Sequence, residues 1–177
     1  CIRDRSIDSF ADYDIDMAVS ILTEIGRFCA QELLPLNGPG DRQGVRFDTE
    51  TGTVITPDGF KELYQKFVES GFFGLSQPIE YGGAGAPHTL SFLVSEMTTA
   101  TNKSFIMCPG LTAGLIDALL VHGTDEQKET FLPKFISGEW SGTMCLTEPQ
   151  CGTDLGLLTT KATPEGDNYR LTGTKIW

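Results

Sequence analysis

Basic residues are scarce in this 177-residue sequence, in which 13 Lys and Arg stand against 24 Asp and Glu, a formal net charge of −11. Proteins that bind nucleic acid displace phosphate counterions with a basic surface, so we expect no nucleic-acid partner. The same acidity does not exclude an anionic small molecule, because helix N-termini and single basic residues can hold phosphate locally.

Long apolar runs, closely paired cysteines and neighbouring histidines are lacking as well. No run approaches the ~20 apolar residues of a membrane-spanning helix, so we expect no membrane span. The five cysteines have no C-x-x-C spacing and His88 lies far from His122, which predicts neither a metal site nor a disulfide framework. Free thiols indicate a reducing compartment: the cytoplasm of a bacterium, or the mitochondrial matrix of a eukaryote. Cys1–Arg5 carries no initiator Met and no signal-peptide core, which predicts an internal start.

The first three quarters of the chain carry helical patterns. Ile15 and Val19 begin an apolar stripe that continues to Leu34, where Pro35 is expected to end the helix. A second helix follows Pro57, with Gly71 as its cap. The remaining predicted helices run to about Thr101, over Gly110–Val121, and from the N-cap Thr124 to near Gly138. The Gly110–Val121 helix is apolar almost all round, so we expect it to be buried.

Three further segments do not show a helical period. Leu36–Thr56 is rich in Gly and Asp, and within it Arg46–Val54 fits either a small hairpin or a plain loop. Ile79–Pro87 is predicted to be a loop, because its glycines and proline cannot hold regular structure. After Gly138, Ser141–Thr147 and Tyr169–Trp177 have strand composition, and the turn-forming residues Pro164–Asn168 predict a hairpin.

A two-stranded hairpin is marginal alone, so these strands are expected to belong to a larger sheet. The fold class is therefore predicted to be mainly α: a helical domain over residues 1–140, followed over 141–177 by the first strands of a β domain.

The most informative stretch is Met144–Gly156, a predicted strand that breaks into a turn of small and hydroxyl-bearing residues. Gly152 leaves room for the close approach of a planar cofactor or a phosphate. Thr147 and Thr153 can donate hydroxyls to ring or phosphate oxygens. Spacing alone leaves Glu148 and Asp154 open as an acid/base pair, although loop carboxylates are more often caps and turn formers.

The stretch resembles the acyl-CoA dehydrogenase signature, in which an aromatic-Cys-aliphatic-Thr-Glu-Pro segment precedes Ala-Gly-Ser-Asp. Met144, Gln150, Cys151 and Thr153 depart from that pattern, and Thr153 keeps the hydroxyl of the usual serine. Three more motifs occur in the family's order: Pro78–Gly85, His122–Pro133 and Gly173–Trp177. Leu34–Gly44 and Cys151–Gly156 resemble a long branch of the family, the one that includes 3-methylmercaptopropionyl-CoA dehydrogenases.

This resemblance implies a helical N-terminal domain, a β-barrel middle domain and a helical C-terminal domain that lies outside these residues. It implies FAD as cofactor, an acyl-CoA substrate dehydrogenated to a 2,3-enoyl-CoA, an electron-transfer flavoprotein as electron acceptor, and a homo-oligomer. The implied catalytic base belongs to the C-terminal domain, so no residue here is assigned that role, and Glu148 is interpreted as structural. Thr153 is also implied to contact the substrate. The implied FAD contacts are Met144, Cys145, Leu146, Thr147, Gly152, Thr153 and Trp177.

Alternatives remain beside these assignments. The chain could be a non-catalytic helical interaction module derived from the same fold, or part of an acyl-CoA oxidase that passes electrons to oxygen. Cys145 and Cys151 could be redox-active or simply packing thiols, and Trp177 could be a core aromatic. Tyr81 and its glycine neighbours could line an acyl pocket or form a rigid loop with no ligand contact.

Overall fold

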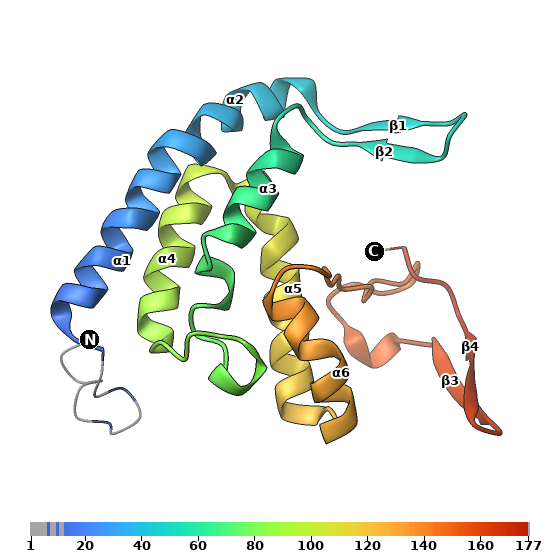
Figure 1. Ribbon diagram of the computed structural model, residues 1–177. Coiled ribbons are helices and arrows are strands. Elements are labelled where there is room, and N and C mark those ends of the chain that lie inside the picture. The colour runs from blue at the N-terminus through green and yellow to red at the C-terminus, as the bar shows by residue number, and fades with distance from the viewer. Residues whose placement is uncertain (1–6, 8–9, 11–12, 177) are drawn as a thin grey trace. The chain divides into compact units, whose positions relative to one another are not determined.

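The computed structural model describes residues 7, 10 and 13–176, which divide into two compact units. The units are Cys1–Gly142 and Thr143–Trp177, whereas the sequence was divided after residue 140. The first unit is helical and the second holds a short sheet, so the chain is mainly α (Figure 1).

A long helical rod opens the described chain. It consists of α1 (Ile15–Phe28), a π-helical turn (Cys29–Leu33) and α2 (Leu34–Gln43). Asp14 caps α1, because its carboxylate accepts the Met17 N–H at 2.7 Å. The prediction that Pro35 ends the helix is wrong. The Leu34 N–H bonds to the Cys29 carbonyl, five residues back, and Pro35 falls in the first turn of α2, where a missing amide costs little.

The predicted apolar stripe is confirmed from Leu22 onward, since Ile25 and Cys29 are buried and Leu22 and Phe28 pack against the core, but it is wrong at the start of α1. Ala18 and Ile25 are buried, whereas Ile15 and Val19 are 50% and 55% exposed. The face toward α4 (His88–Thr101) carries small residues, since a Cβ added to Gly26 would lie 3.3 Å from Met97 Cε. In the first turns of α1, the small Ala18 therefore lies in the core while Ile15 and Val19 face outward.

After the rod, β1 (Arg46–Asp48) and β2 (Thr53–Ile55) form an antiparallel hairpin in which Phe47 pairs with Val54. The hairpin alternative for Arg46–Val54 is thus confirmed. Figure 1 shows it extending away from the helices. The α3 helix (Phe60–Glu69) follows, with Leu63 and Phe67 buried, and Gly71 adopts a positive φ of 73° just beyond its end.

The loop before α4 is closed by its own backbone. The Ala84, Gly85 and Ala86 N–H groups bond to the carbonyls of Gly74, Gln77 and Leu75 at 2.9–3.0 Å. Ile79–Tyr81 forms one 3₁₀ turn within the predicted loop. A Cβ on Gly83 would lie 2.1 Å from the Gln77 carbonyl oxygen, so the chain itself requires a glycine there. These contacts favour the rigid-loop interpretation of this segment.

The last two helices of the unit are α5 (Lys103–His122) and α6 (Asp125–Ile136). Thr124 caps α6 as predicted, in a reciprocal capping box with Gln127. The expectation of a buried fourth helix is wrong, because α5 starts at Lys103 and leaves Met107 and Val121 49% and 71% exposed. The α5 helix is long and apolar enough to cross a membrane. Core helices of globular proteins are often equally long and apolar, so this property alone is weak evidence for a membrane span.

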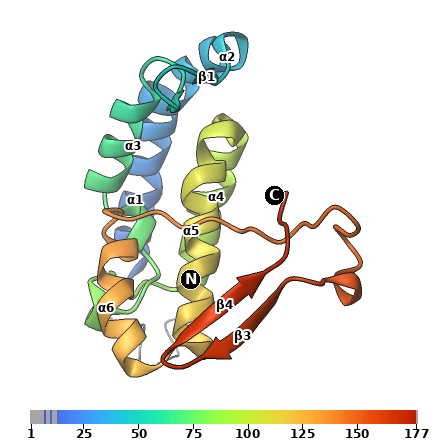
Figure 2. The same cartoon turned by 90° about the vertical axis from the view of Figure 1, so that its right-hand side faces the viewer.

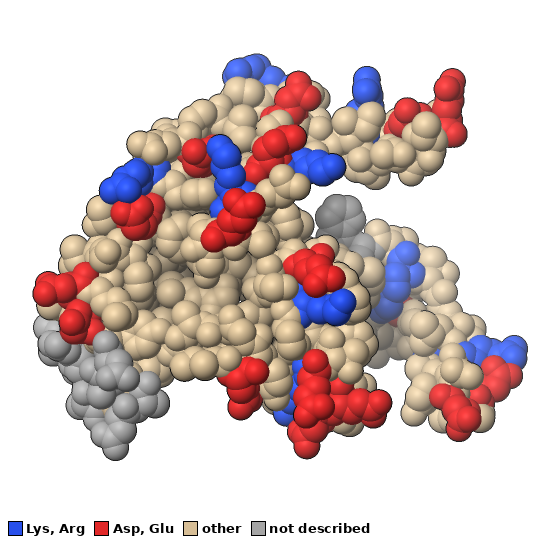
Figure 3. Space-filling model, in the orientation of Figure 1, with Lys and Arg blue, Asp and Glu red and all other residues tan. Residues whose placement is uncertain are grey.

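Two apolar clusters hold the helical unit together. The larger joins the rod, α3, α4 and the start of α5, and Phe67 meets Phe105 edge-to-face at 5.8 Å. The smaller joins α5 and α6 through Ile116 and Leu132, with Tyr81 packed against it. Figure 2 shows the helices of this unit running alongside one another. In Figure 3, basic side chains on this face of the unit are scattered among acidic ones.

The second unit contains β3 (Lys161–Glu165) and β4 (Asn168–Thr172), paired antiparallel from Lys161↔Thr172 to Glu165↔Asn168. Gly166 takes the first turn position with φ 61°, the sign that a type II′ hairpin turn requires. The hairpin is thus confirmed, but the predicted strand Ser141–Thr147 is not formed within the described residues. Strand composition alone does not make a strand, because a ladder needs a neighbouring partner.

Candidate functional site

The loop that carries the signature is fixed by backbone bonds. Glu148 and Cys151 exchange N–H···O bonds of 2.9 and 3.1 Å, which closes a tight turn around Pro149 and Gln150. The Ile176 N–H donates to the Thr147 carbonyl at 3.0 Å. The end of the chain thus pairs with the signature loop across almost thirty residues of sequence.

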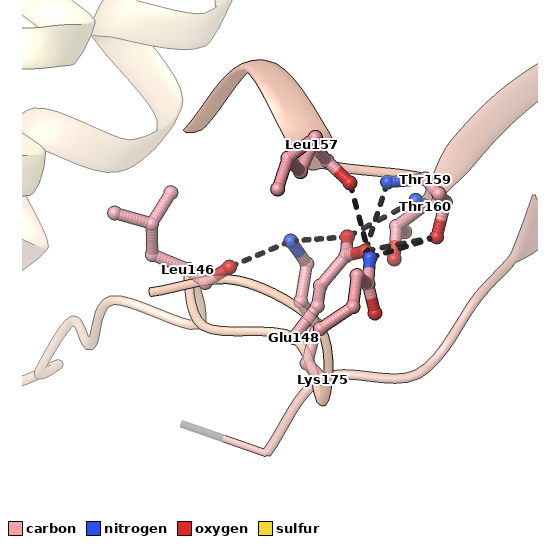
Figure 4. A network of polar contacts seen from close by, with 7 residues as sticks. Leu146, Glu148, Leu157, Thr159, Thr160 and Lys175 are labelled. Carbon is pink, nitrogen blue, oxygen red and sulfur yellow. Dashed lines mark hydrogen bonds and ion pairs between the residues drawn. The ribbon is translucent and has the colours of Figure 1, made fainter. Parts of the chain in front are cut away.

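Glu148 lies at the centre of this unit, with only 1% of its surface exposed. Its Oε2 accepts from the Thr159 N–H at 2.8 Å, the Thr159 hydroxyl at 2.9 Å and the Gln150 side-chain amide. Its Oε1 accepts from the Thr160 N–H at 3.0 Å and from Lys175 Nζ at 2.9 Å. Figure 4 shows these donors converging on the carboxylate. Five donors satisfy a charge whose burial would otherwise be costly.

The same donors hold the pKa of Glu148 far below its ordinary value of 4.5, with the Thr159 N–H as the largest cause and Lys175 among the others. A carboxylate so strongly held as its anion is a poor proton acceptor. Asp154 is also occupied, since it accepts the Gly156 N–H at 3.2 Å and caps the 3₁₀ turn Leu155–Leu157. These contacts favour the structural interpretation of Glu148 over a role in an acid/base pair with Asp154.

The loop leaves the predicted cofactor-binding groups available. Met144, Cys145, Gly152 and Thr153 are exposed, while Leu146 and Thr147 are half-buried. Within the described residues the hydroxyls of Thr147 and Thr153 have no protein hydrogen-bond partner. A Cβ on Gly152 would meet only Thr147 Cγ2, at an ordinary 3.8 Å, so internal packing does not account for this glycine. Trp177 lies outside the described residues.

These features test whether the segment fits a flat, polar-edged cofactor. Within the described residues, two hydroxyls without a protein partner accompany Gly152, which has room beside it for a ligand, and backbone bonds hold the turn that carries them. The two hydroxyls can donate hydrogen bonds to ring heteroatoms or to phosphate oxygens. The glycine leaves room for the ligand to approach the backbone closely. The residues present therefore fit the group that the sequence predicts.

Sequence reasoning missed three residues that hold the loop. Gln150 donates to Glu148 and also to the Leu157 carbonyl at 3.1 Å. Thr159 and Lys175 reach Glu148 from 11 and 27 positions away, and Lys175 Nζ also donates to the Leu146 carbonyl at 2.9 Å. Of this network, the sequence indicates only Glu148, as a loop carboxylate expected to accept hydrogen bonds from nearby donors.

Two pockets are lined by described residues of the helical unit. One of about 350 Å³ lies among Phe72, Gln77, Ser95 and Asp117, and one of about 840 Å³ lies under the β1–β2 hairpin beside Cys108. Burial raises the pKa of the Cys108 thiol, which argues against its being a reactive nucleophile. The described cysteines, Cys29, Cys108, Cys145 and Cys151, form no disulfide with one another, and the described residues contain no metal-ligating cluster.

The comparisons with known proteins agree on one family. A model described as the N-terminal domain of acyl-CoA dehydrogenases matches residues 18–139. The chain is 42% identical over 174 residues to 3-methylmercaptopropionyl-CoA dehydrogenase of Ruegeria pomeroyi, covering 98% of this chain and 29% of that protein. It is 34% identical over 179 residues to a butyryl-CoA dehydrogenase of Syntrophomonas wolfei, covering 97% and 29%.

A solved structure gives the same result. Butyryl-CoA dehydrogenase from Megasphaera elsdenii superposes with a TM-score of 0.76 and 27% identity, over 93% of this chain and 41% of that one. The resemblance stated from the motifs is therefore confirmed. The chain spans 29% of the length of the two curated relatives named above.

Proposed function

The chain belongs to the acyl-CoA dehydrogenase family, and from that premise we propose that it forms the N-terminal part of an FAD-dependent acyl-CoA dehydrogenase. The proposed reaction removes hydrogen from the α and β carbons of an acyl-CoA thioester and gives a 2,3-enoyl-CoA. The observation that carries this proposal is the signature loop around the buried Glu148, in which the Thr147 and Thr153 hydroxyls bond to none of the described residues and Gly152 leaves room for a ligand.

In this proposal each loop residue has a distinct task. FAD, when bound, supplies the acceptor for the electrons removed from the substrate. Thr147 and Thr153 would donate hydrogen bonds to the cofactor, and Thr153 also to the acyl thioester. Met144, Cys145 and Leu146 would offer apolar contact to the ring, and Gly152 would allow its close approach. The Glu148 network keeps these groups in one geometry before any ligand binds.

The base that takes the α proton is proposed to lie outside residues 1–177. Among the described carboxylates of the loop, Glu148 and Asp154 are both engaged by protein donors. A general base must keep a lone pair within reach of the substrate proton. Glu148 does not meet this condition, and Asp154 serves as the cap of the Leu155–Leu157 turn, so the assignment of the base to a C-terminal domain stands as part of the proposal.

Partners and location follow the same reasoning. We propose an electron-transfer flavoprotein as the electron acceptor, a homo-oligomeric assembly, and a bacterial cytoplasm or mitochondrial matrix as the compartment. The acyl-CoA oxidase alternative differs in passing electrons to oxygen, so oxygen consumption during turnover separates the two. A non-catalytic interaction module has no use for the free hydroxyls at Thr147 and Thr153, which favours the enzyme.

The first expected result concerns cofactor content. The full-length protein, purified gently, should carry non-covalent FAD and lose its visible absorbance when 3-methylmercaptopropionyl-CoA or butyryl-CoA is added without oxygen. These are the acyl-CoAs named for the relatives. A colourless protein that takes up no added FAD would contradict the proposal.

A second expected result concerns Thr153. In the full-length protein, Thr153→Val keeps the side-chain shape but leaves a ligand acceptor unpaired, which costs about 1–3 kcal/mol in a desolvated site. The dissociation constant for FAD or for acyl-CoA should rise by about 5- to 150-fold. Titration of flavin fluorescence and of substrate-induced spectral change measures both.

Thr163→Val is the matched control for this substitution, because Thr163 is exposed in β3 of the same unit. Its FAD and substrate affinities should equal those of wild type. Asp154→Asn should mainly alter folding of the 3₁₀ turn that Asp154 caps. Unchanged binding and turnover in Thr153→Val would remove Thr153 from the site.

A further inference from the structure

Lys175 joins two segments of the second unit that the proposed function places along the flavin. Its ammonium donates to the Leu146 carbonyl and to Glu148 Oε1, both at 2.9 Å. Leu146 belongs to the predicted cofactor segment Met144–Thr153, and Lys175 to the segment Gly173–Trp177. Figure 4 shows the ammonium between the two oxygens.

Glu148 does not depend on Lys175 alone for its burial. Four other donors reach its carboxylate, two of them backbone N–H groups. Lys175 is the charged member of this donor set, beside four neutral donors. Its distinctive contact is the one to the Leu146 carbonyl, which ties the start of the signature loop to the same buried anchor.

A second contact joins the two segments beside the lysine. The Ile176 N–H donates to the Thr147 carbonyl at 3.0 Å. Lys175 is 27% exposed on its side chain and Glu148 1%, so the ion pair lies largely out of water. Charge-assisted bonds in such surroundings are short and directional, and they fix geometry more firmly than bonds between neutral groups.

We propose that Lys175 is a positioning residue of the flavin site, which holds the 144–147 and 173–176 backbones in register through Leu146 and Glu148. This inference rests on the proposed function, since it assumes that both segments contact the flavin. Residues that orient the groups touching a reactive centre commonly change its performance by 10- to 100-fold when removed. Small misplacements of reacting groups have effects of similar size.

The test compares Lys175→Met with wild type in the full-length holoprotein. The rate constant of flavin reduction per bound flavin, measured in a single turnover with 3-methylmercaptopropionyl-CoA or butyryl-CoA, should fall about 10- to 100-fold. The dissociation constant for the acyl-CoA should stay within about threefold, because Lys175 does not touch it in this proposal. A purely structural lysine would lower the yield of holoprotein but leave the rate per flavin unchanged.

A second readout needs no cofactor. The Ile176 amide is bonded to Thr147, so its hydrogen exchange reports how firmly the two segments are joined. In the flavin-free protein, Lys175→Met should speed exchange at Ile176 by about tenfold or more. The exchange measurement does not depend on the proposed function. A wild-type protein that neither binds FAD nor reduces it would contradict the proposed function, whatever the exchange rate at Ile176.

Two further variants complete the design. Lys161→Met is the matched control, since Lys161 is exposed in β3 and forms no ion pair within the described part of the chain; it should behave as wild type in both readouts. If Lys175→Met does not fold because Glu148 loses its cation, the double variant with Glu148→Gln removes both charges and is compared with Glu148→Gln alone. Flavin reduction within twofold of the parent, with unchanged Ile176 exchange, overturns the proposal.

Discussion

Residues 1–177 produced on their own should show no acyl-CoA-dependent reduction of a dye acceptor and should bind FAD weakly. The described site offers one hydroxyl-bearing loop to the cofactor, and the buried carboxylate of that loop, Glu148, is taken up by protein donors. All ten residues of β3 and β4 are exposed, and a two-stranded sheet is marginal without further strands. We therefore also expect aggregation through the open strand edges.

The measurement is turnover of dichlorophenolindophenol or a similar dye with butyryl-CoA, alongside light scattering of the same sample. The full-length protein at equal concentration is the control and should reduce the dye. Tyr169 and Leu171 in β4 are 68% and 76% exposed, so replacing both by Thr should reduce scattering without creating activity. Dye reduction by residues 1–177 alone would show that the site is complete in this part of the chain.

The helices of the first unit could be predicted because their signals are local. Thr124 with Gln127 fixes the start of α6 from four consecutive residues, and Gly71 marks the end of α3. The prediction that the helix ends at Pro35 was wrong because a π-helical turn precedes the proline and the helix continues beyond it. A π turn has no sequence signature of its own. The inward face of α1 was predicted correctly from Leu22 onward, whereas Ile15 and Val19 proved exposed because Ala18 takes the inward position there.

In the second unit, nearby residues in the sequence predict the hairpin but not the contacts that fix the signature loop. The β3–β4 hairpin follows from its turn residues, whereas Ser141–Thr147 has strand composition but no partner within the described residues. The sequence suggests a structural role for Glu148, but its partners Thr159 and Lys175 lie 11 and 27 positions away. Sequence spacing does not predict side-chain contacts over such separations. The hydrogen-bond network that fixes the loop could therefore be found only from the structure.

Glu148→Gln in the full-length protein should destabilise the second unit strongly, while flavin reduction falls no further than the roughly 100-fold expected when the geometry of the loop is disturbed. The amide that replaces one carboxylate oxygen would turn its own N–H groups toward donors, either Thr160 and Lys175 or Thr159 and Gln150. Donors facing donors in a buried site cannot all be satisfied. Amide hydrogen exchange across residues 144–176 should therefore speed up in the variant.

The pH dependence gives an independent check with a definite sign. The pKa of Glu148 is depressed in the folded protein below its ordinary 4.5, so its ionised form stabilises the fold fully above that value. This contribution is lost as pH falls from about 4.5 toward the depressed pKa of the folded state. Wild type should thus lose protection in the second unit over that acid range, and Glu148→Gln should lose much less.

Flavin reduction separates this structural role from a catalytic one. Losing a general base slows proton transfer by about 10²- to 10⁴-fold even when the substrate binds normally. Glu148 instead has its lone pairs occupied by five protein donors, so Glu148→Gln should change the geometry of the loop and not the identity of the base. Asp167→Asn, an exposed carboxylate in the β3–β4 turn, is the matched control. A variant that keeps FAD and binds acyl-CoA normally, but reduces its flavin several orders of magnitude more slowly than both wild type and this control, would place the base at Glu148 and overturn the assignment.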